Sequence, residues 1–379
     1  MFLLDTLFIL DSFLEAFMTN ETLLNYDEML KSLTGTKHLL LGNGFSINCD
    51  TTYRYSNLFQ YAQAHGFSDR LNELFRHFGT TNFERVVRAL DDTEWLAKLY
   101  RLLHDEGEKA LRDDAQTIKE ALVTAVAHTH LDRPSDIADP RIEQCVEFLK
   151  PFDNVFTTNY DLLLYWTQMH GLVEQFEDGF RESVDEPGAD YVVFSQHLGA
   201  KRGIFYLHGA LHLYEAGGEV RKHSWSRSQV PLKEMVLEAL GKDQFPMFVA
   251  EGEGWRKLEQ IQSSSYMSYC LGKLKRCKNN LIVYGSSLGD SDEHIVNAIA
   301  DGAFQTVCLG VYGDHESAAA KAAEVTALKL QSRRRMQRRP APLNVLFYDL
   351  RTASVWDPVY PAVIPVFNAT AAIPLTRTA

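Results

Sequence analysis

The sequence predicts an α/β fold built on a mostly parallel sheet with helices on both faces. Short apolar runs recur along the chain, and helical patterns separate most of them, as parallel strands joined by crossovers require. The runs are apolar throughout instead of alternating with polar residues, which is typical of strands covered on both faces. These observations favour a Rossmann-like sheet, with strands expected at residues 37–41, 154–157, 204–207, 247–250, 281–284, 307–312 and 345–348.

The segment between the first two expected strands predicts a helical insertion. It is rich in helix-forming residues and poor in strand patterns, and residues 82–90 and 113–128 have helical spacing. Another helical pattern, near residues 21–33, precedes the first strand. The predicted domains are an N-terminal helical segment at 1–36, a sheet domain at 37–54 and 151–350, an inserted helical subdomain at 55–150, and a tail at 351–379.

Composition excludes several classes of function. A chain of 379 residues can bury a full core, and its net charge of −12 argues against a general nucleic-acid-binding surface. The five cysteines are dispersed and form no Cys-x-x-Cys pair, so neither a disulfide framework nor a four-cysteine zinc ribbon is expected. A reducing cytoplasm fits this cysteine usage best.

The first eighteen residues lack the features of a secretory signal. They contain no Lys or Arg, and Asp5, Asp11 and Glu15 interrupt the apolar stretch. Apolar residues recur at helical spacing, so we expect an amphipathic helix that serves packing or oligomerisation. The missing basic residues argue against contact with an anionic membrane.

A run of five arginines lies within residues 332–340. We expect it to be a solvated helix end, because cations stabilise the C-terminus of a helix. Contact with RNA or with an anionic partner is the alternative.

A glycine-bearing turn follows the first expected strand, at Gly42-Asn43-Gly44-Phe45-Ser46. Glycines let backbone amides approach a phosphate, and the helix that follows would present its positive N-terminus to it. A complete dehydrogenase fingerprint would have a third glycine at position 47 and an acidic residue about twenty positions on, and both are missing. The turn therefore favours phosphate binding without hydride transfer. The alternative is an ordinary strand-to-helix turn with Ser46 as N-cap.

Two further motifs place an amide and an imidazole at strand ends. In Thr157-Thr158-Asn159-Tyr160-Asp161, Asp161 is most simply a helix N-cap, whereas the amide of Asn159 can orient a water or a ribose hydroxyl. The alternative for Asn159 is a turn former.

His208 precedes Gly209 at the end of another apolar run, where an imidazole can take a proton from a ribose hydroxyl. A structural histidine is the alternative. His212 lies four residues later, but no third ligand has matching spacing, so no metal is expected.

The fourth motif is Gly285-Ser286-Ser287-Leu288, followed by Gly-Asp-Ser-Asp. Small residues let a dinucleotide lie across the strand end, and serine hydroxyls can bind phosphate or ribose oxygens. The acidic residues favour the N-terminus of the next helix, so a helix entry with acidic capping is the alternative.

Taken together, the four motifs resemble those of the bacterial sirtuin-like proteins of anti-phage defence. In order, they correspond to that family's Gly-Ala-Gly phosphate loop, its Thr-Gln-Asn-x-Asp strand end, its His-Gly and its Gly-Thr/Ser-Ser-Leu turn. The resemblance covers about residues 37–350 and extends to Asp178-Gly179-Phe180 and to a helix bearing Lys257. The zinc-binding Cys-x-x-Cys pairs of the protein deacylases are absent, and a helical insertion replaces that module.

The resemblance implies an NAD+ hydrolase that cleaves the nicotinamide–ribose bond, with no metal and with Asn159 and His208 as catalytic residues. It further implies an effector of abortive infection that is gated by homo-oligomerisation or by an activating sensor subunit, with nucleic acid reached only through a partner. The alternatives are a non-catalytic sensor of NAD or ADP-ribose, and an NAD-dependent deacylase or ADP-ribosyltransferase. The residues implied to bind the dinucleotide are Gly42, Asn43, Gly44, Phe45, Ser46, Thr158, Asp161, Gly285, Ser286 and Ser287.

Overall fold

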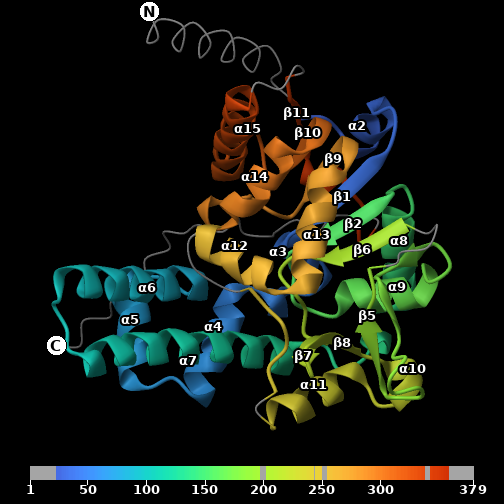
Figure 1. Ribbon diagram of the computed structural model, residues 1–379. Helices are drawn as coiled ribbons and strands as arrows, with labels where there is room; N and C mark the ends of the chain where they lie inside the picture. Colours follow the sequence, from blue (N-terminus) through green and yellow to red (C-terminus); the bar gives the residue numbers. More distant parts are fainter. Residues whose placement is uncertain (1–22, 197–201, 243, 250–253, 338–341, 358–379) are drawn as a thin grey trace, which may run out of the picture.

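The computed structural model describes residues 23–196, 202–242, 244–249, 254–337 and 342–357, and Figure 1 shows their arrangement. The helix expected within the first eighteen residues lies outside these ranges. None of the described helices combines the length and apolar character needed to cross a membrane.

Within the described ranges, seven parallel strands form the main sheet in the order β11-β10-β9-β1-β2-β6-β3 (Figure 1), which confirms the predicted Rossmann-like α/β fold. After β1 the chain adds β2, then the edge strand β3, and then β6 between them on one side of β1, and it later adds β9, β10 and β11 in turn on the other side. The order of the strands therefore reverses between β1 and β9, where doubly wound sheets bind ligands. The strands of this sheet are β1 (Lys37–Leu41), β2 (Asn154–Thr157), β3 (Phe176–Glu177), β6 (Arg202–Tyr206), β9 (Lys278–Tyr284), β10 (Ala303–Val311) and β11 (Asn344–Asp349).

Helices lie on both faces of this sheet, because right-handed crossovers in opposite directions place their helices on opposite faces. On one face, α12 to α15 pack against one another and against β6 and β10. On the other, α8 contacts α9, and the Tyr26 ring of α2 lies 5.7 Å from the Phe148 ring of α8. These helices are α2 (Tyr26–Ser32), α3 (Asn43–Cys49), α8 (Asp139–Leu149), α9 (Leu163–Gly171), α12 (Gly254–Ser263), α13 (Ser265–Arg276), α14 (Glu293–Asp301) and α15 (Ala318–Met336).

All of the regular structure between β1 and β2 is helical in the described chain. Besides α3 and α8 it consists of α4 (Tyr55–His65), α5 (Asp69–Phe78), α6 (Phe83–Tyr100), α7 (Asp105–Thr129) and the short 3-10 helices η1 (Thr51–Tyr53) and η2 (Pro134–Asp136). Stacked and edge-on rings of Phe59, Phe67, Phe75 and Phe83 hold α4, α5 and α6 together.

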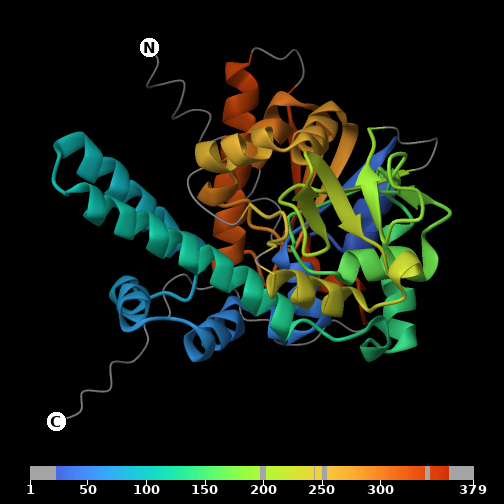
Figure 2. The ribbon, with the colours of Figure 1, turned by 60° about the horizontal axis from the view of Figure 1, so that its bottom comes forward.

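The antiparallel pair α6–α7 projects from the body of the molecule (Figure 2). Its tip exposes a group of large apolar side chains, which include Leu102 at 70% exposure and Tyr100 at 66%. We call this group the apolar tip. Its members are Trp95, Leu96, Leu99, Tyr100, Leu102 and Leu103. Clustered apolar exposure of this kind is typical of surfaces that contact another protein.

A second, antiparallel sheet was not expected from the sequence. It has the order β4-β5-β8-β7, built from β4 (Phe180–Glu182), β5 (Tyr191–Phe194), β7 (Leu213–Ala216) and β8 (Glu219–His223). The short helices α10 (Trp225–Ser228) and α11 (Leu232–Leu240) follow it, and η3 (Asp290–Asp292) and η4 (Leu350–Thr352) complete the regular elements. The strand expected at 247–250 is wrong for its described part, which forms a single bridge between Phe248 and Gly209.

The described part of the arginine run forms the last turn of α15, as expected of a helix end, but this end is only partly solvated. Arg333 forms an ion pair with Asp301, at 2.9 Å. Arg334 is buried and donates hydrogen bonds to the carbonyl oxygens of Gly302 and Phe304, at 3.0 and 2.9 Å. These contacts attach α15 to the end of α14 and to β10.

Several histidines are buried in the uncharged form. Nδ1–H of His130 donates to the Leu131 carbonyl, and its Nε2 accepts the amide of Leu162, each at 2.8 Å. A second proton on this ring would face the N–H of Leu162. Burial lowers the pKa of His130 and of His223 to about 4, and burial together with Lys257 lowers that of His294 to about 3.

Because these imidazoles are buried and neutral, we expect the free energy of unfolding to decrease as the pH is lowered. Between pH 7.5 and 5.5 the unfolded chain takes up protons on these groups, with pKa values near 6.5, while the folded chain does not. Each such histidine then lowers the free energy of unfolding by about 1 kcal/mol at pH 5.5. Urea unfolding at the two pH values measures the difference. An unchanged free energy of unfolding would contradict the buried, neutral state of these rings.

Candidate functional site

Two glycine turns pack against each other where the strand order reverses. The amide of Gly42 donates to the Tyr284 carbonyl at 2.9 Å, and that of Gly44 donates to the Gly285 carbonyl at 2.8 Å. A Cβ on Gly44 would lie 2.6 Å from the Cα of Gly285, and one on Gly42 would lie 2.5 Å from the Cβ of Ser286. Only glycine permits this approach, so the turns after β1 and β9 form one rigid unit.

The structure requires glycine at positions 42 and 44 for a different reason from the one expected from the sequence. Their amides are used between the turns, whereas phosphate binding was expected of them. Helix α3 begins after Gly42, its N-cap, so Ser46 lies inside the helix and is not the N-cap. The hydroxyl of Ser46 is directed instead to the motif after β2.

A buried hydrogen-bond network joins the first and second motifs. The side-chain amide of Asn159 donates to the Gly42 carbonyl at 3.0 Å and to Oγ of Ser46 at 2.7 Å. The Ser46 hydroxyl donates in turn to Asp161 at 2.5 Å, and Asp161 also accepts the amide of Leu163, the first residue of α9. The chain of donors fixes the orientation of the Asn159 carboxamide, because both partners of its nitrogen must accept.

Asp161 is fully buried, and desolvation raises its pKa, against the hydrogen bonds from Ser46 and Leu163, which lower it. The carboxyl therefore does two structural tasks. It holds the start of α9, close to the capping role expected from the sequence, and it anchors the hydroxyl that supports Asn159.

His208 emerges from β6, the neighbour of β2. The amide of Leu207 donates to the Thr157 carbonyl at 2.8 Å, so His208 and Asn159 leave adjacent strand ends. The Nε2 of His208 lies 2.8 Å from Nε2 of His294, a residue of α14. Because α14 follows β9, this contact spans the ends of β1 and β2 and ties the third motif to the fourth.

A buried charge pair accompanies the two imidazoles. Lys257 of α12 is fully buried, and its Nζ lies 3.7 Å from a carboxylate oxygen of Asp292. The ligand atoms of His208, Asp292 and His294 all lie within 4.8 Å of one another. Burial, Lys257 and His294, in that order, lower the pKa of His208 well below its usual value.

Of the other residues predicted to bind the dinucleotide, some are part of the protein core and others are open to solvent. Phe45 is buried, its ring lies 5.0 Å from that of Trp356, and its carbonyl accepts the indole N–H at 2.9 Å. Asn43 donates to the Tyr53 carbonyl at 3.3 Å, and the amide of Thr158 donates to the Leu41 carbonyl at 3.0 Å. Phe45 is therefore part of the core.

In the fourth motif, Oγ of Ser286 accepts the amide of Leu288 at 3.2 Å, and the carbonyl of Ser287 accepts the hydroxyl of Thr326 at 3.0 Å. Ser286 is half-buried and the Ser287 side chain is exposed. These two serines thus remain partly open on the rim of the turn.

Sequence reasoning assigned no role to His294 and interpreted Asp292 as one of the acids that favour the start of the next helix. Both lie directly after the fourth motif, in Asp-x-His spacing, but the acidic residues around them were interpreted as helix capping. Lys257 was noted only as part of the resemblance. The signal that could have found them is a histidine in the first turn of a helix that follows a predicted ligand loop.

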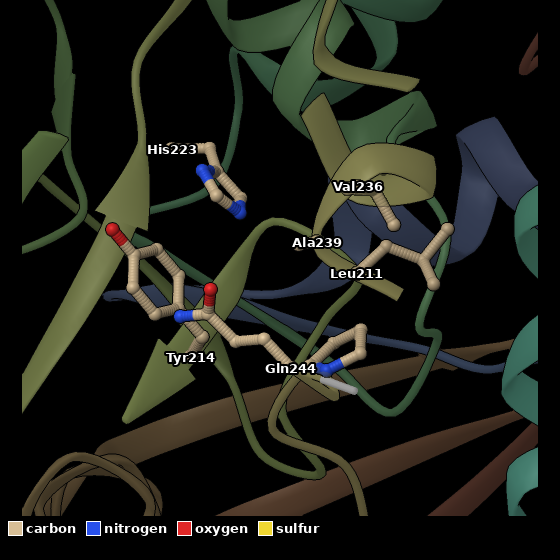
Figure 3. Close-up of a pocket in the computed structure, with 7 residues that line it drawn as sticks. Leu211, Tyr214, His223, Val236, Ala239 and Gln244 are labelled. Carbon is tan, nitrogen blue, oxygen red and sulfur yellow. The ribbon is translucent and has the colours of Figure 1, made fainter. Parts of the chain in front are cut away.

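The candidate site is closed in this conformation. His208 is 2% exposed and Asn159 is 8% exposed. A pocket with an empty volume of about 150 Å³ lies elsewhere, between the β7–β8 sheet and α11, where the rings of His223 and Tyr214 stack (Figure 3). It includes none of the predicted site residues, and much of its space is open to solvent instead of enclosed, unlike a small-molecule site.

The glycine contact can be tested by substitution. We expect Gly44→Ala to lower the free energy of unfolding by roughly 1–3 kcal/mol, because the new methyl group must displace backbone across the turn. Gly289→Ala is the matched control in the loop after β9, which Gly44 contacts, since a Cβ on Gly289 would lie 3.7 Å from its nearest neighbour. Chemical denaturation measures both. Equal stability of the two variants would show that the turns are not in close contact.

The comparison with protein families covers nearly all of the described fold. The family model described as a domain of unknown function (DUF4917) matches residues 39–356, from β1 to the tryptophan that packs on α3. No curated protein is significantly similar to the chain in sequence. All four motifs lie inside the matched segment, and the chain belongs to the DUF4917 family.

Proposed function

We propose that the protein hydrolyses NAD+ at the nicotinamide–ribose bond, giving nicotinamide and ADP-ribose. The observation that carries the proposal is the hydrogen bonding of Asn159 to Gly42 and Ser46 at the point where the strand order reverses. It joins the expected phosphate loop to the expected catalytic amide. His208 leaves the adjacent strand end, so the chemical groups that the resemblance implies occupy one edge of the sheet.

His208 is uncharged, as a base must be, and the burial that keeps it so in the closed site also weakens it as a base until the site opens. Its lowered pKa keeps the ring uncharged at neutral pH, and a neutral imidazole can accept a proton from a ribose hydroxyl. Asn159 uses its amino group for structure, which leaves its carbonyl oxygen as the group that can accept a hydrogen bond from the attacking water.

The reaction needs no general acid to protonate the leaving group, because the nicotinamide ring is already cationic in NAD+ and leaves as a neutral molecule. Its transition state resembles the oxocarbenium ion of glycoside cleavage. Positioning of the water and stabilisation of the sugar cation would supply most of the acceleration. Neither task requires a metal.

Closure of the site supports a gated activity. NAD+ can reach His208 and Asn159 only after the surrounding segments move, so the described conformation corresponds to a resting state. An enzyme that consumes NAD+ must rest in this way inside its own cell. Assembly or a partner subunit is the proposed trigger, in an abortive-infection response, and the apolar tip is a surface on which such a contact can act.

The competing function is a sensor that binds NAD or ADP-ribose without cleaving it. The buried site is compatible with both, and the products distinguish them. Chromatography of NAD+ incubated with the protein, co-expressed with its genomic neighbours so that an activating partner is present, would show nicotinamide and ADP-ribose for a hydrolase and unchanged NAD+ for a sensor.

The catalytic roles predict the behaviour of two variants. We expect His208→Ala and Asn159→Ala each to lower the rate of NAD+ loss by about 100-fold or more, since general bases and positioned groups contribute about that much. Asn159→Ala should also lower thermal stability, because it removes two buried hydrogen bonds.

Asn48→Ala is the matched control for the second variant. Asn48 lies on α3, is buried, and donates to the Tyr284 hydroxyl at 2.8 Å. We expect this variant to lose stability while NAD+ hydrolysis continues. If either His208→Ala or Asn159→Ala keeps the wild-type rate, or if Asn48→Ala loses as much activity as Asn159→Ala, the assigned roles are wrong.

A further inference from the structure

The contact between His208 and His294 constrains where their protons lie. The two Nε2 atoms are 2.8 Å apart, and the rings are 2% and 3% exposed. Among the described residues, the charged groups that face the pair are Lys257 of α12 and Asp292 of η3. Both imidazoles are uncharged at neutral pH, because burial and Lys257 lower both pKa values. One proton, not two, therefore lies between the Nε2 atoms.

Two arrangements of this proton are possible. Either His294 donates to His208, or His208 donates to His294. In a neutral imidazole, the nitrogen that does not carry the proton is the acceptor, so each arrangement also fixes the state of both Nδ1 atoms.

The surroundings of His294 select the resting arrangement. Its Nδ1 is buried and has no hydrogen-bond partner among the described residues. A proton on this atom would be a buried donor with no acceptor among the described residues, which is unfavourable. At rest, His294 therefore carries its proton on Nε2 and donates it to His208, whose own proton lies on Nδ1, an atom that is not among the buried atoms without a partner. The single lone pair of the His208 ring is then occupied, and His208 is not available as a base.

We propose that His294 contacts the bound dinucleotide and switches His208 into its basic form. An oxygen of the ligand accepts a hydrogen bond from Nδ1–H of His294, so that Nε2 of His294 becomes the acceptor. The proton between the two Nε2 atoms moves to His208, which then donates from Nε2. His208 releases its Nδ1 proton to the water that enters as the site opens, so its Nδ1 has a free lone pair, and Nδ1 of His294 takes up one proton in exchange. This inference rests on the proposed NAD+ hydrolysis and adds to it a residue that couples substrate binding to the state of the base.

A transition metal is the rival occupant of this cluster. Two imidazoles and a carboxylate match the ligand types of such ions. However, Lys257 already compensates the charge of Asp292 at 3.7 Å, so a divalent cation would add uncompensated charge to a buried site. An oxygen-bearing ligand that accepts a proton from His294 meets no such cost.

Proton positions can be read directly in the wild-type protein. Long-range ¹H–¹⁵N spectra of histidine-labelled protein distinguish Nδ1–H from Nε2–H, and the variants His208→Gln and His294→Gln assign the two rings. We expect His294 to change from the Nε2–H to the Nδ1–H form when ADP-ribose is added. A response to ADP as well would identify a phosphate oxygen as the acceptor, and a response to ADP-ribose alone would identify the second ribose.

Two substitutions at the same position separate the two contacts of His294. Gln places an amide near the position of Nε2, and Asn places one near that of Nδ1. We expect both variants to lower kcat by about 100-fold. Only His294→Gln should also weaken ADP-ribose binding, by about tenfold, since it alone loses the ligand hydrogen bond. A purely structural histidine would not give this split.

His212→Gln is the matched control. His212 is also fully buried, lies four residues after His208, and packs against the rings of Tyr165 and Tyr206. We expect it to keep wild-type kcat and ADP-ribose affinity. The inference is overturned if ADP-ribose binds without changing the His294 tautomer, if His294→Gln is as active as wild type or more active, or if His212→Gln loses as much.

Stoichiometric binding of Zn²⁺ that is lost in His294→Gln would also overturn it. The same experiments test the proposed NAD+ hydrolysis separately from the switch. If wild type hydrolyses NAD+ and His294→Gln is unaffected, the switch fails and the hydrolase stands. If ADP-ribose changes the tautomer but NAD+ is not cleaved by the activated protein, the hydrolase fails and the ligand contact of His294 stands.

Discussion

The site depends on the backbone contact between the turns after β1 and β9. Two amide–carbonyl hydrogen bonds hold these turns together, and the glycines leave no room for a side chain between them. This contact fixes the start of α3, and with it Ser46 and the carbonyl of Gly42, to which Asn159 binds. It also fixes the origin of the segment that leads to His294. The side chains of the candidate site are thus positioned from one place in the backbone.

Around this contact, buried polar groups of the site pair with one another, whereas Nδ1 of His294 has no hydrogen-bond partner among the described residues. Asn159, Ser46 and Asp161 form a directed chain of donors and acceptors, and His208 and His294 share one proton. Burial of such groups is costly unless each finds a partner, so a satisfied network holds the molecule in a single closed arrangement. Opening the site for a ligand must exchange these partners for those that the ligand brings.

The sequence predicted the parallel sheet well because its strands are buried on both faces and read as continuous apolar runs. It missed the antiparallel sheet because strands such as β8 are short and rich in polar residues. It located the four motifs, since strand ends and glycines are visible locally. It did not predict that Gly42 and Gly44 bind a second turn more than 240 residues away in the chain, or that His294 reaches across two strands to His208. Such pairings follow from the strand order.

The long helix α7 connects the apolar tip to the candidate site. It has 25 residues, which is about 38 Å of continuous helix. One end lies at the exposed tip, and the other is capped by His130, whose ring holds the amide of Leu162 next to Asp161. A continuous helix of this length is stiff, so its two ends move together. A partner that displaced the tip would act through this helix on His130, which contacts the chain three residues after Asn159.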